Sequence, residues 1–90
     1  MFLDVTVVST NKRVWSGSAI MVKVPAEGGD MGFLPNHEPV MALLRPGTVT
    51  ISPTSDTGSA EDVVFNVTQG FVSLYDNRVN IVVDDVIETK

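Results

Sequence analysis

The chain has 90 residues, of which 43% are hydrophobic and 19% charged, and its formal net charge is -5. We expect a single domain at residues 1–90, because this length is that of one small domain, and a cytoplasmic protein, because no secretory or membrane-spanning hydrophobic run occurs. The six scattered lysines and arginines argue against binding to nucleic acid or directly to lipid, and the lack of cysteine excludes disulfides and thiolate chemistry.

Short alternating segments dominate the chain and predict β-strands. Hydrophobic and polar residues alternate over residues 3–7, 20–24, 48–52, 63–68 and 78–83, which is the period of a half-buried strand. Turn-forming residues separate these segments at residues 10–12, 16–17, 45–47, 52–61 and 76–77. Asp76-Asn77 is the best hairpin turn, since both residue types tolerate positive φ. We predict an all-β fold, an antiparallel two-sheet β-sandwich of about eight to ten short strands.

Residues 39–44 are the nearest approach to helical periodicity, and they are too few for a stable helix. The glycines are densest just before them, at Gly28, Gly29 and Gly32, and are followed by Pro35 and Pro39. A phosphate-binding loop would continue with a lysine, a hydroxyl and a helix, which this segment lacks. We therefore interpret residues 28–39 as a loop of tight turns or bulges for folding and docking, and not as an active site.

Catalytic and metal sites find little support in the sequence. The single histidine, His37, lies beside Glu38, but neighbours in an extended segment point to different sides, and no nucleophile is near in the sequence. A metal site built from His37, Glu27, Asp30 and Glu38 lacks a second histidine or a cysteine. Three acidic residues near the end of the chain indicate a solvated strand end: Asp84, Asp85 and Glu88. We predict no catalytic residue, cofactor or metal.

Residues 28–39 also mix hydrophobic and charged side chains, as protein-binding surfaces do. Met31, Phe33 and Leu34 would be the hydrophobic anchors beside Asp30 and other polar groups. Alternatively, Phe33 and Leu34 cap the core of the sandwich. The residue pattern leaves both interpretations open.

Several motifs in a fixed order resemble the N-terminal β-sandwich domain of the epsilon subunit of F-type ATP synthases, over nearly the whole chain. The most specific is Gly-x-x-Gly-x-Leu-Pro-x-His-x-Pro at residues 29–39. The others are Val14-Trp15-Ser16-Gly17, Leu44-Arg45-Pro46-Gly47, Gly70-Phe71-Val72 and Asn77-Arg78-Val79-Asn80-Ile81. Two positions depart from the family pattern, since Gln69 and Asn36 stand where glycine is frequent.

The resemblance implies a flattened sandwich of about ten strands in the rotor's central stalk. Such a subunit is non-catalytic, needs no cofactor and couples proton flow to ATP synthesis, peripheral to the cytoplasmic face of the bacterial membrane. It implies contacts with the polar loops of the c-ring through Asp30, Met31 and His37. It implies contacts with the gamma subunit through the following residues: Ser9, Met41, Ala42 and Leu44. Family members usually continue into a C-terminal helical hairpin, whereas this chain ends at Lys90.

Two other hypotheses belong to different classes of protein. A free-standing β-sandwich adaptor would bind other proteins by pairing with an edge strand. A small hydrolase would use His37 and lose its activity in His37→Ala.

Overall fold

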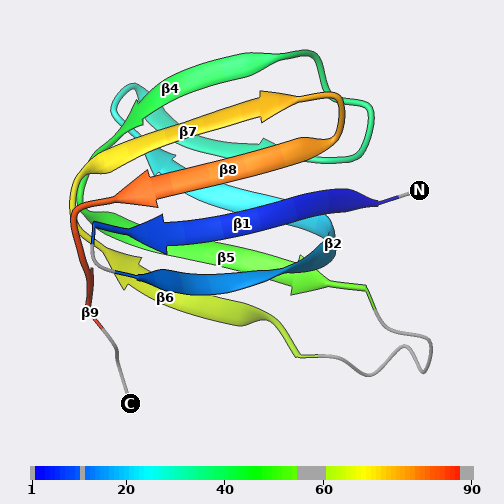
Figure 1. Cartoon of the computed structure of the whole chain (residues 1–90). Coiled ribbons are helices and arrows are strands. Elements are labelled where there is room, and N and C mark those ends of the chain that lie inside the picture. Colours follow the sequence, from blue (N-terminus) through cyan, green and yellow to red (C-terminus); the bar gives the residue numbers. More distant parts are fainter. Residues whose placement is uncertain (1, 11, 55–60, 88–90) are drawn as a thin grey trace.

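The computed structural model describes residues 2–10, 12–54 and 61–87, and every regular element in them is a strand (Figure 1). These segments hold no helix that is long and apolar enough to cross a membrane. The all-β prediction is confirmed. The strands are β1 (Leu3–Ser9), β2 (Arg13–Ala26), β3 (Gly29–Phe33), β4 (Val40–Leu44), β5 (Gly47–Pro53), β6 (Val63–Val67), β7 (Gly70–Tyr75), β8 (Arg78–Val83) and β9 (Val86–Ile87).

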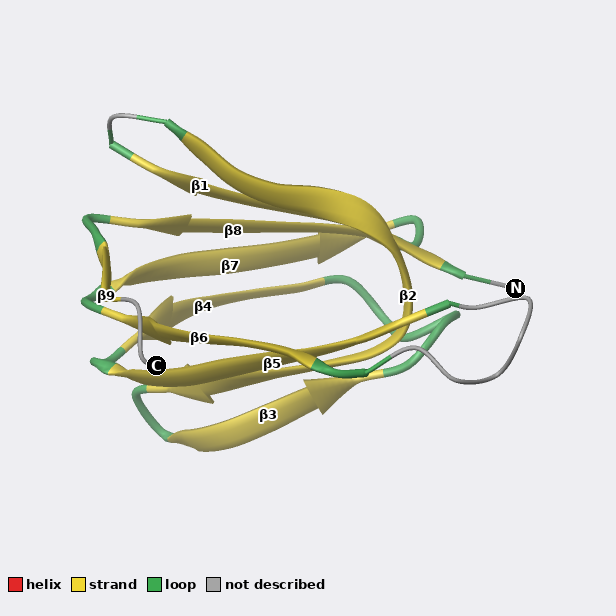
Figure 2. Ribbon diagram, turned by 90° about the horizontal axis from the view of Figure 1, so that it is seen from below, coloured by secondary structure: helices red, strands yellow, loops and turns green. Residues whose placement is uncertain are grey.

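The strands form two layers that are joined by the long strand β2. One layer has the order β1-β8-β7-β4, and the other contains β3, β2, β5, β6 and β9. β2 bends between the layers, as Figure 2 shows: its first half pairs with β1 and its second half with β3 and β5. The principal extents of 32 × 32 × 22 Å give the sandwich its flattened form.

One strand pairing differs from the antiparallel prediction. β1 lies between β2 and β8, and it pairs with β8 in parallel, with Val5 opposite Val79 and Val7 opposite Ile81. The β7–β8 hairpin delivers β8 in the direction of β1, and the amide of Asp4 donates to the carbonyl of Asn77 at 2.8 Å. The pairing joins the two ends of the chain, and no local pattern in the sequence signals it.

The core lies between the layers, and buried side chains alternate with more exposed ones along β1, β5, β7 and β8. Phe33 is the largest of the fully buried residues, and the described residues include no buried polar or charged one. Phe33 therefore belongs to the core, whereas its neighbour Leu34 is 58% exposed. The alternative that these residues cap the core therefore holds for Phe33 and not for Leu34, and a docking role for Leu34 stays a prediction.

The predicted turn at residues 16–17 is wrong, and the predicted turn at Asp76-Asn77 is confirmed. Residues 16–17 lie inside β2, where Ser16 pairs with Thr6 and Gly17 with Val5, and the Trp15 ring lies over Gly17. Residues 39–44 are mostly strand β4. Asp76 and Asn77 adopt φ angles of 52° and 62° in the β7–β8 turn, as predicted. Of the predicted loop at residues 52–61, residues 55–60 lie outside the described residues, as does Glu88 of the acidic end.

The segment at residues 28–39 is only partly a loop. Its first half is strand β3, which pairs with β2 from Phe33 opposite Val22 to Gly29 opposite Ala26. Gly29 has φ of 132°, a conformation that glycine adopts without strain, and Asn36 has φ of 71° in the turn after β3. Asparagine thus takes the left-handed conformation at the position where glycine is frequent in the family.

Candidate functional site

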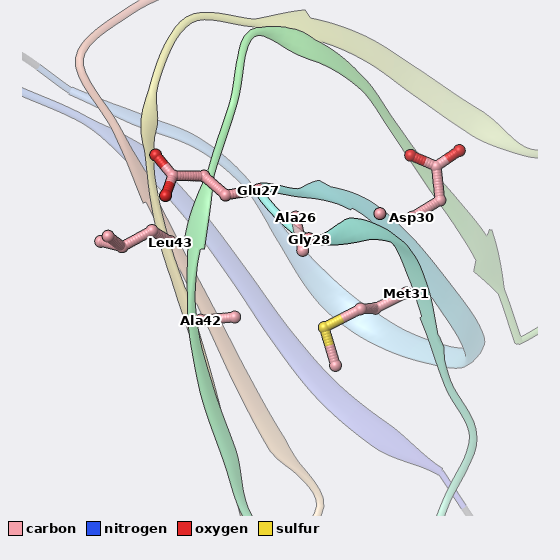
Figure 3. Close-up of a pocket in the computed structure, with 8 residues that line it drawn as sticks. Ala26, Glu27, Gly28, Asp30, Met31, Ala42 and Leu43 are labelled. Atoms are coloured by element: carbon pink, nitrogen blue, oxygen red, sulfur yellow. The ribbon is translucent and has the colours of Figure 1, made fainter.

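A groove opens along one side of the sandwich between the edge strands β3 and β4. We call this hollow of about 410 Å³ the β3–β4 groove. Met31 from β3 and Ala42 from β4 face one another across it, while Asp30 points away from it (Figure 3). Its lining residues are Ala26, Glu27, Gly28, Gly29, Asp30, Met31, Ala42 and Leu43.

The groove exists because β3 and β4 are attached to β2 and not to each other. β4 meets β2 at one residue pair, Ala26 with Leu44, next to a hydrogen bond of 2.9 Å from the Glu27 amide to the Leu43 carbonyl. β3 and β4 both pair with Ala26 at one of their ends, and they separate from each other with distance from it. Glycine and alanine line much of the space between them and do not fill it.

Arg45 binds two of the residues that line the groove, Ala26 and Asp30. Its Nη2 donates to Oδ1 of Asp30 at 3.0 Å, and its Nε donates to the carbonyl of Ala26 at 3.2 Å. The Asp30 side chain is 77% exposed and that of Arg45 51%, so solvent weakens the ion pair. Asp30, which the resemblance assigns to the c-ring contact, therefore already has a cation of its own chain beside it.

His37 lies beyond the opposite end of β3. Its ring stands edge-on to the Phe33 ring, with centroids 5.4 Å apart, and its Nδ1 lies 2.8 Å from the carbonyl oxygen of Glu38. The strand from Asp30 to Phe33 alone spans about 10 Å, at about 3.3 Å per residue. The structure thus brings Asp30 and Met31 together and keeps His37 apart from them. Among the described residues, no group of three or more acidic or histidine side chains is placed to hold a metal.

The residues predicted for the gamma side do not share one surface. Met41 is exposed on the outer face of β4, whereas Ala42 lines the groove. Leu44 is 1% exposed and belongs to the core, so its side chain is not available to a partner. Ser9 pairs with Val83, Val83 with Gly70, and Gly70 with Leu44, so these four residues form one row across β1, β8, β7 and β4. Neighbouring strands are about 4.8 Å apart, which puts Ser9 and Leu44 about 14 Å from each other.

Sequence reasoning missed a hydrophobic surface on the outer face of β4 and β7. Leu43 pairs with Phe71 and Met41 with Ser73, so Met41, Leu43, Phe71 and Tyr75 all lie on these two neighbouring strands. We call these four residues the β4–β7 patch. If each full side chain has an area of about 200 Å², the exposed fractions of these four residues add up to a surface of about 500 Å². This area is at the upper end of the range for the largest hydrophobic patch on a monomeric protein.

A signal for this patch is present in the sequence. All five residues of β4 are hydrophobic, and β7 has hydrophobic residues on both of its faces. A strand with one face in water normally alternates with polar residues, so a hydrophobic second face indicates that it is covered by something. Residues 39–44 were interpreted as the nearest approach to helical periodicity, so the second hydrophobic face of this strand was not recognised.

Comparisons with known proteins agree with this architecture. The family model described as "ATP synthase, Delta/Epsilon chain, beta-sandwich domain" matches residues 2–89. The ATP synthase epsilon chain of Streptomyces coelicolor is 39% identical over 82 residues, which are 91% of this chain and 63% of that protein. This chain thus spans less than two thirds of the length of the curated relatives it matches.

Two solved structures share the fold. A chain of the Euglena gracilis mitochondrial ATP synthase, in a structure of its OSCP, F1 and c-ring, superposes with a TM-score of 0.83 at 18% identity, covering 96% of this chain and 52% of that one. A chain in the central stalk and c-ring structure of the Tetrahymena thermophila mitochondrial ATP synthase gives 0.77 at 21% identity, covering 96% and 66%. The strands, the motifs and the family match agree, and the chain belongs to the β-sandwich domain family of the ATP synthase delta and epsilon chains.

Proposed function

We propose that this domain is a non-catalytic part of the ATP synthase central stalk, which docks on the c-ring and on the gamma subunit and couples proton flow to ATP synthesis. The observation that carries the proposal is the family match over residues 2–89, joined to an open groove whose walls hold Asp30, Met31 and Ala42. The domain would work at the cytoplasmic face of the bacterial membrane, peripheral to it through the complex. Relatives named as epsilon chains and the central-stalk setting of one similar structure support this role.

The c-ring contact is best supported along strand β3. Asp30 and Met31 lie in β3, and His37 lies in the segment that follows it. Within residues 2–10, 12–54 and 61–87, β3 pairs only with β2, so no described strand covers its other edge. An orientation with this edge along the polar loops of the ring lets all three residues contact it, whereas an orientation with one end of the sandwich down would leave Asp30 or His37 out.

The gamma contact is best supported at the β4–β7 patch. Methionine and aromatic side chains are enriched in the centres of protein interfaces, and Met41 and Tyr75 are the most exposed members of the patch. A standard interface covers about 800 Å² on each partner, so a patch of about 500 Å² fits as its hydrophobic centre. Ala42 borders this surface from the groove, and Ser9 joins the contact if the partner extends across β7 and β8.

Cysteine cross-linking tests both contacts, since the chain has no cysteine of its own. Met31→Cys and His37→Cys should each form disulfides with cysteines in the c-subunit loops, and Tyr75→Cys with cysteines on gamma. Val64→Cys is the matched control, because Val64 is exposed on β6, which is three strands away from β3 and lies in the layer opposite the β4–β7 patch. Equal cross-linking from position 64, or none from 31 and 75 in a folded and assembled complex, would contradict the proposal and favour the adaptor hypothesis.

A further inference from the structure

We propose that Arg45 is a positioning residue for the ring-contacting segment: it fixes the carboxylate of Asp30 relative to the carbonyl of Ala26. The inference rests on the proposed function, because it takes the segment around Asp30 as the surface that meets the c-ring. It goes further because it assigns the rigidity of the segment around Asp30 to one side chain, that of Arg45 in the turn between β4 and β5.

Arg45 reaches across the end of β2 with three hydrogen bonds. Its amide donates to the carbonyl of Pro25 at 2.9 Å, its Nε to the carbonyl of Ala26 at 3.2 Å, and its Nη2 to Oδ1 of Asp30 at 3.0 Å. Pro25 and Asp30 are partners across β2 and β3. The guanidinium therefore bridges the turn after β4 to both strands of the β2–β3 hairpin.

The turn between β2 and β3 has little packing of its own. A Cβ placed on Gly28 or Gly29 would meet no heavy atom within 4 Å apart from those of its chain neighbours, so the space where a side chain would stand is open at both residues. Glycine also has the widest choice of backbone conformations and loses the most freedom when it is ordered. The bonds from Arg45 order the residues on both sides of this turn at Ala26 and Asp30.

Ordering before contact improves binding, because a partner then need not supply the cost of fixing the segment. The planar guanidinium can bind a carbonyl and a carboxylate at once in a fixed geometry. A lysine ammonium on its flexible stem does not fix the relative position of two such groups as well. In a family domain that docks by this segment, Arg45 thus acts on the ring through Asp30 without touching the ring itself.

The test is a double-mutant cycle on binding to ATP synthase complexes assembled without this chain. Arg45→Met keeps the hydrophobic stem and should weaken binding about fivefold, in the range of one partly exposed charged hydrogen bond. Asp30→Ala should weaken it at least as much, and the double variant should be no weaker than Asp30→Ala alone. Arg45→Lys should fall between wild type and Arg45→Met. Arg78→Met, which removes the same charge on β8, should bind as wild type.

Three outcomes would overturn the assignment. Additive losses in the double variant would mean that Arg45 contacts the ring directly, and unchanged binding of Arg45→Met would mean that it positions nothing. A loss of binding fully explained by unfolding, as measured by circular dichroism on the same samples, would leave Arg45 with a structural role alone. If the wild-type chain itself fails to bind the complexes, the proposed function fails first, and that result is distinct because it does not depend on any variant.

Discussion

Replacement of Phe33 by alanine should be the most damaging single change next to the candidate site. Phe33 has no exposed surface and fixes the end of β3 in the core. Truncation of a buried phenylalanine costs about 3–5 kcal/mol, through lost burial and the cavity left behind. A chain of this length is stable by only about 5–13 kcal/mol, so the change removes a large part of the free energy of unfolding. The expected fall in the melting temperature is about 15–30 °C.

Thermal and urea unfolding followed by circular dichroism, and by fluorescence of the single Trp15, would measure this loss. Leu34→Ala is the matched control, because Leu34 is adjacent in sequence and exposed, and it should cost less than about 1 kcal/mol. Equal destabilisation by Phe33→Ala and Leu34→Ala, or a cost below about 1 kcal/mol for Phe33→Ala, would refute the assignment of Phe33 to the core.

Three further outcomes are expected. Gly70→Ala would place a Cβ 2.0 Å from the carbonyl oxygen of Val82 and 2.7 Å from Cα of Val83, so the strands β7 and β8 must separate locally; urea unfolding should show a loss of about 3 kcal/mol or more. Asn77→Gly keeps the positive φ but removes the side-chain oxygen that accepts a hydrogen bond of 2.6 Å from the Asn36 amide, and it should lower the free energy of unfolding by about 1 kcal/mol in the same assay. Asn77→Ala should cost more, because alanine is also strained at a positive φ. Tyr75→Ser should weaken binding to gamma about tenfold or more while the melting temperature stays within a few degrees, because Tyr75 is exposed on the isolated chain.

The sequence predicted those parts of the structure that depend on neighbours in the chain. Alternation along β1, β5 and β8 predicted which side chains are buried, and Asp76-Asn77 predicted a tight turn, because period and φ preference are local properties. The parallel β1–β8 pairing was not predicted, since it depends on contacts between residues more than 70 positions apart. Residues 16–17 resembled a turn because a ring that covers Gly17 cannot be inferred from serine and glycine alone.

The candidate site shows the same division. The motif at residues 29–39 placed Asp30, Met31 and His37 in one segment, but only the structure shows that β3 separates His37 from the other two. The ion pair between Asp30 and Arg45 joins residues 15 positions apart, and it forms because Ala26 brings β3 and β4 to the same end of β2. Leu44 was assigned to a partner contact by its motif position, whereas the pleat of β4 turns it into the core.

The path from the candidate site into the rest of the domain runs through β2. This strand pairs with β1, β3, β4 and β5, and Val22 is buried at a point where Phe33 of β3 and Ile51 of β5 lie on its two sides. If β3 contacts the ring as proposed, a force applied to β3 would reach both layers through this one continuous strand. Dense packing on that strand makes the response stiff. Under the proposed function, stiffness between the β3 edge and the β4–β7 patch is what transmits rotation, and the bend of β2 connects the layers that carry the two surfaces.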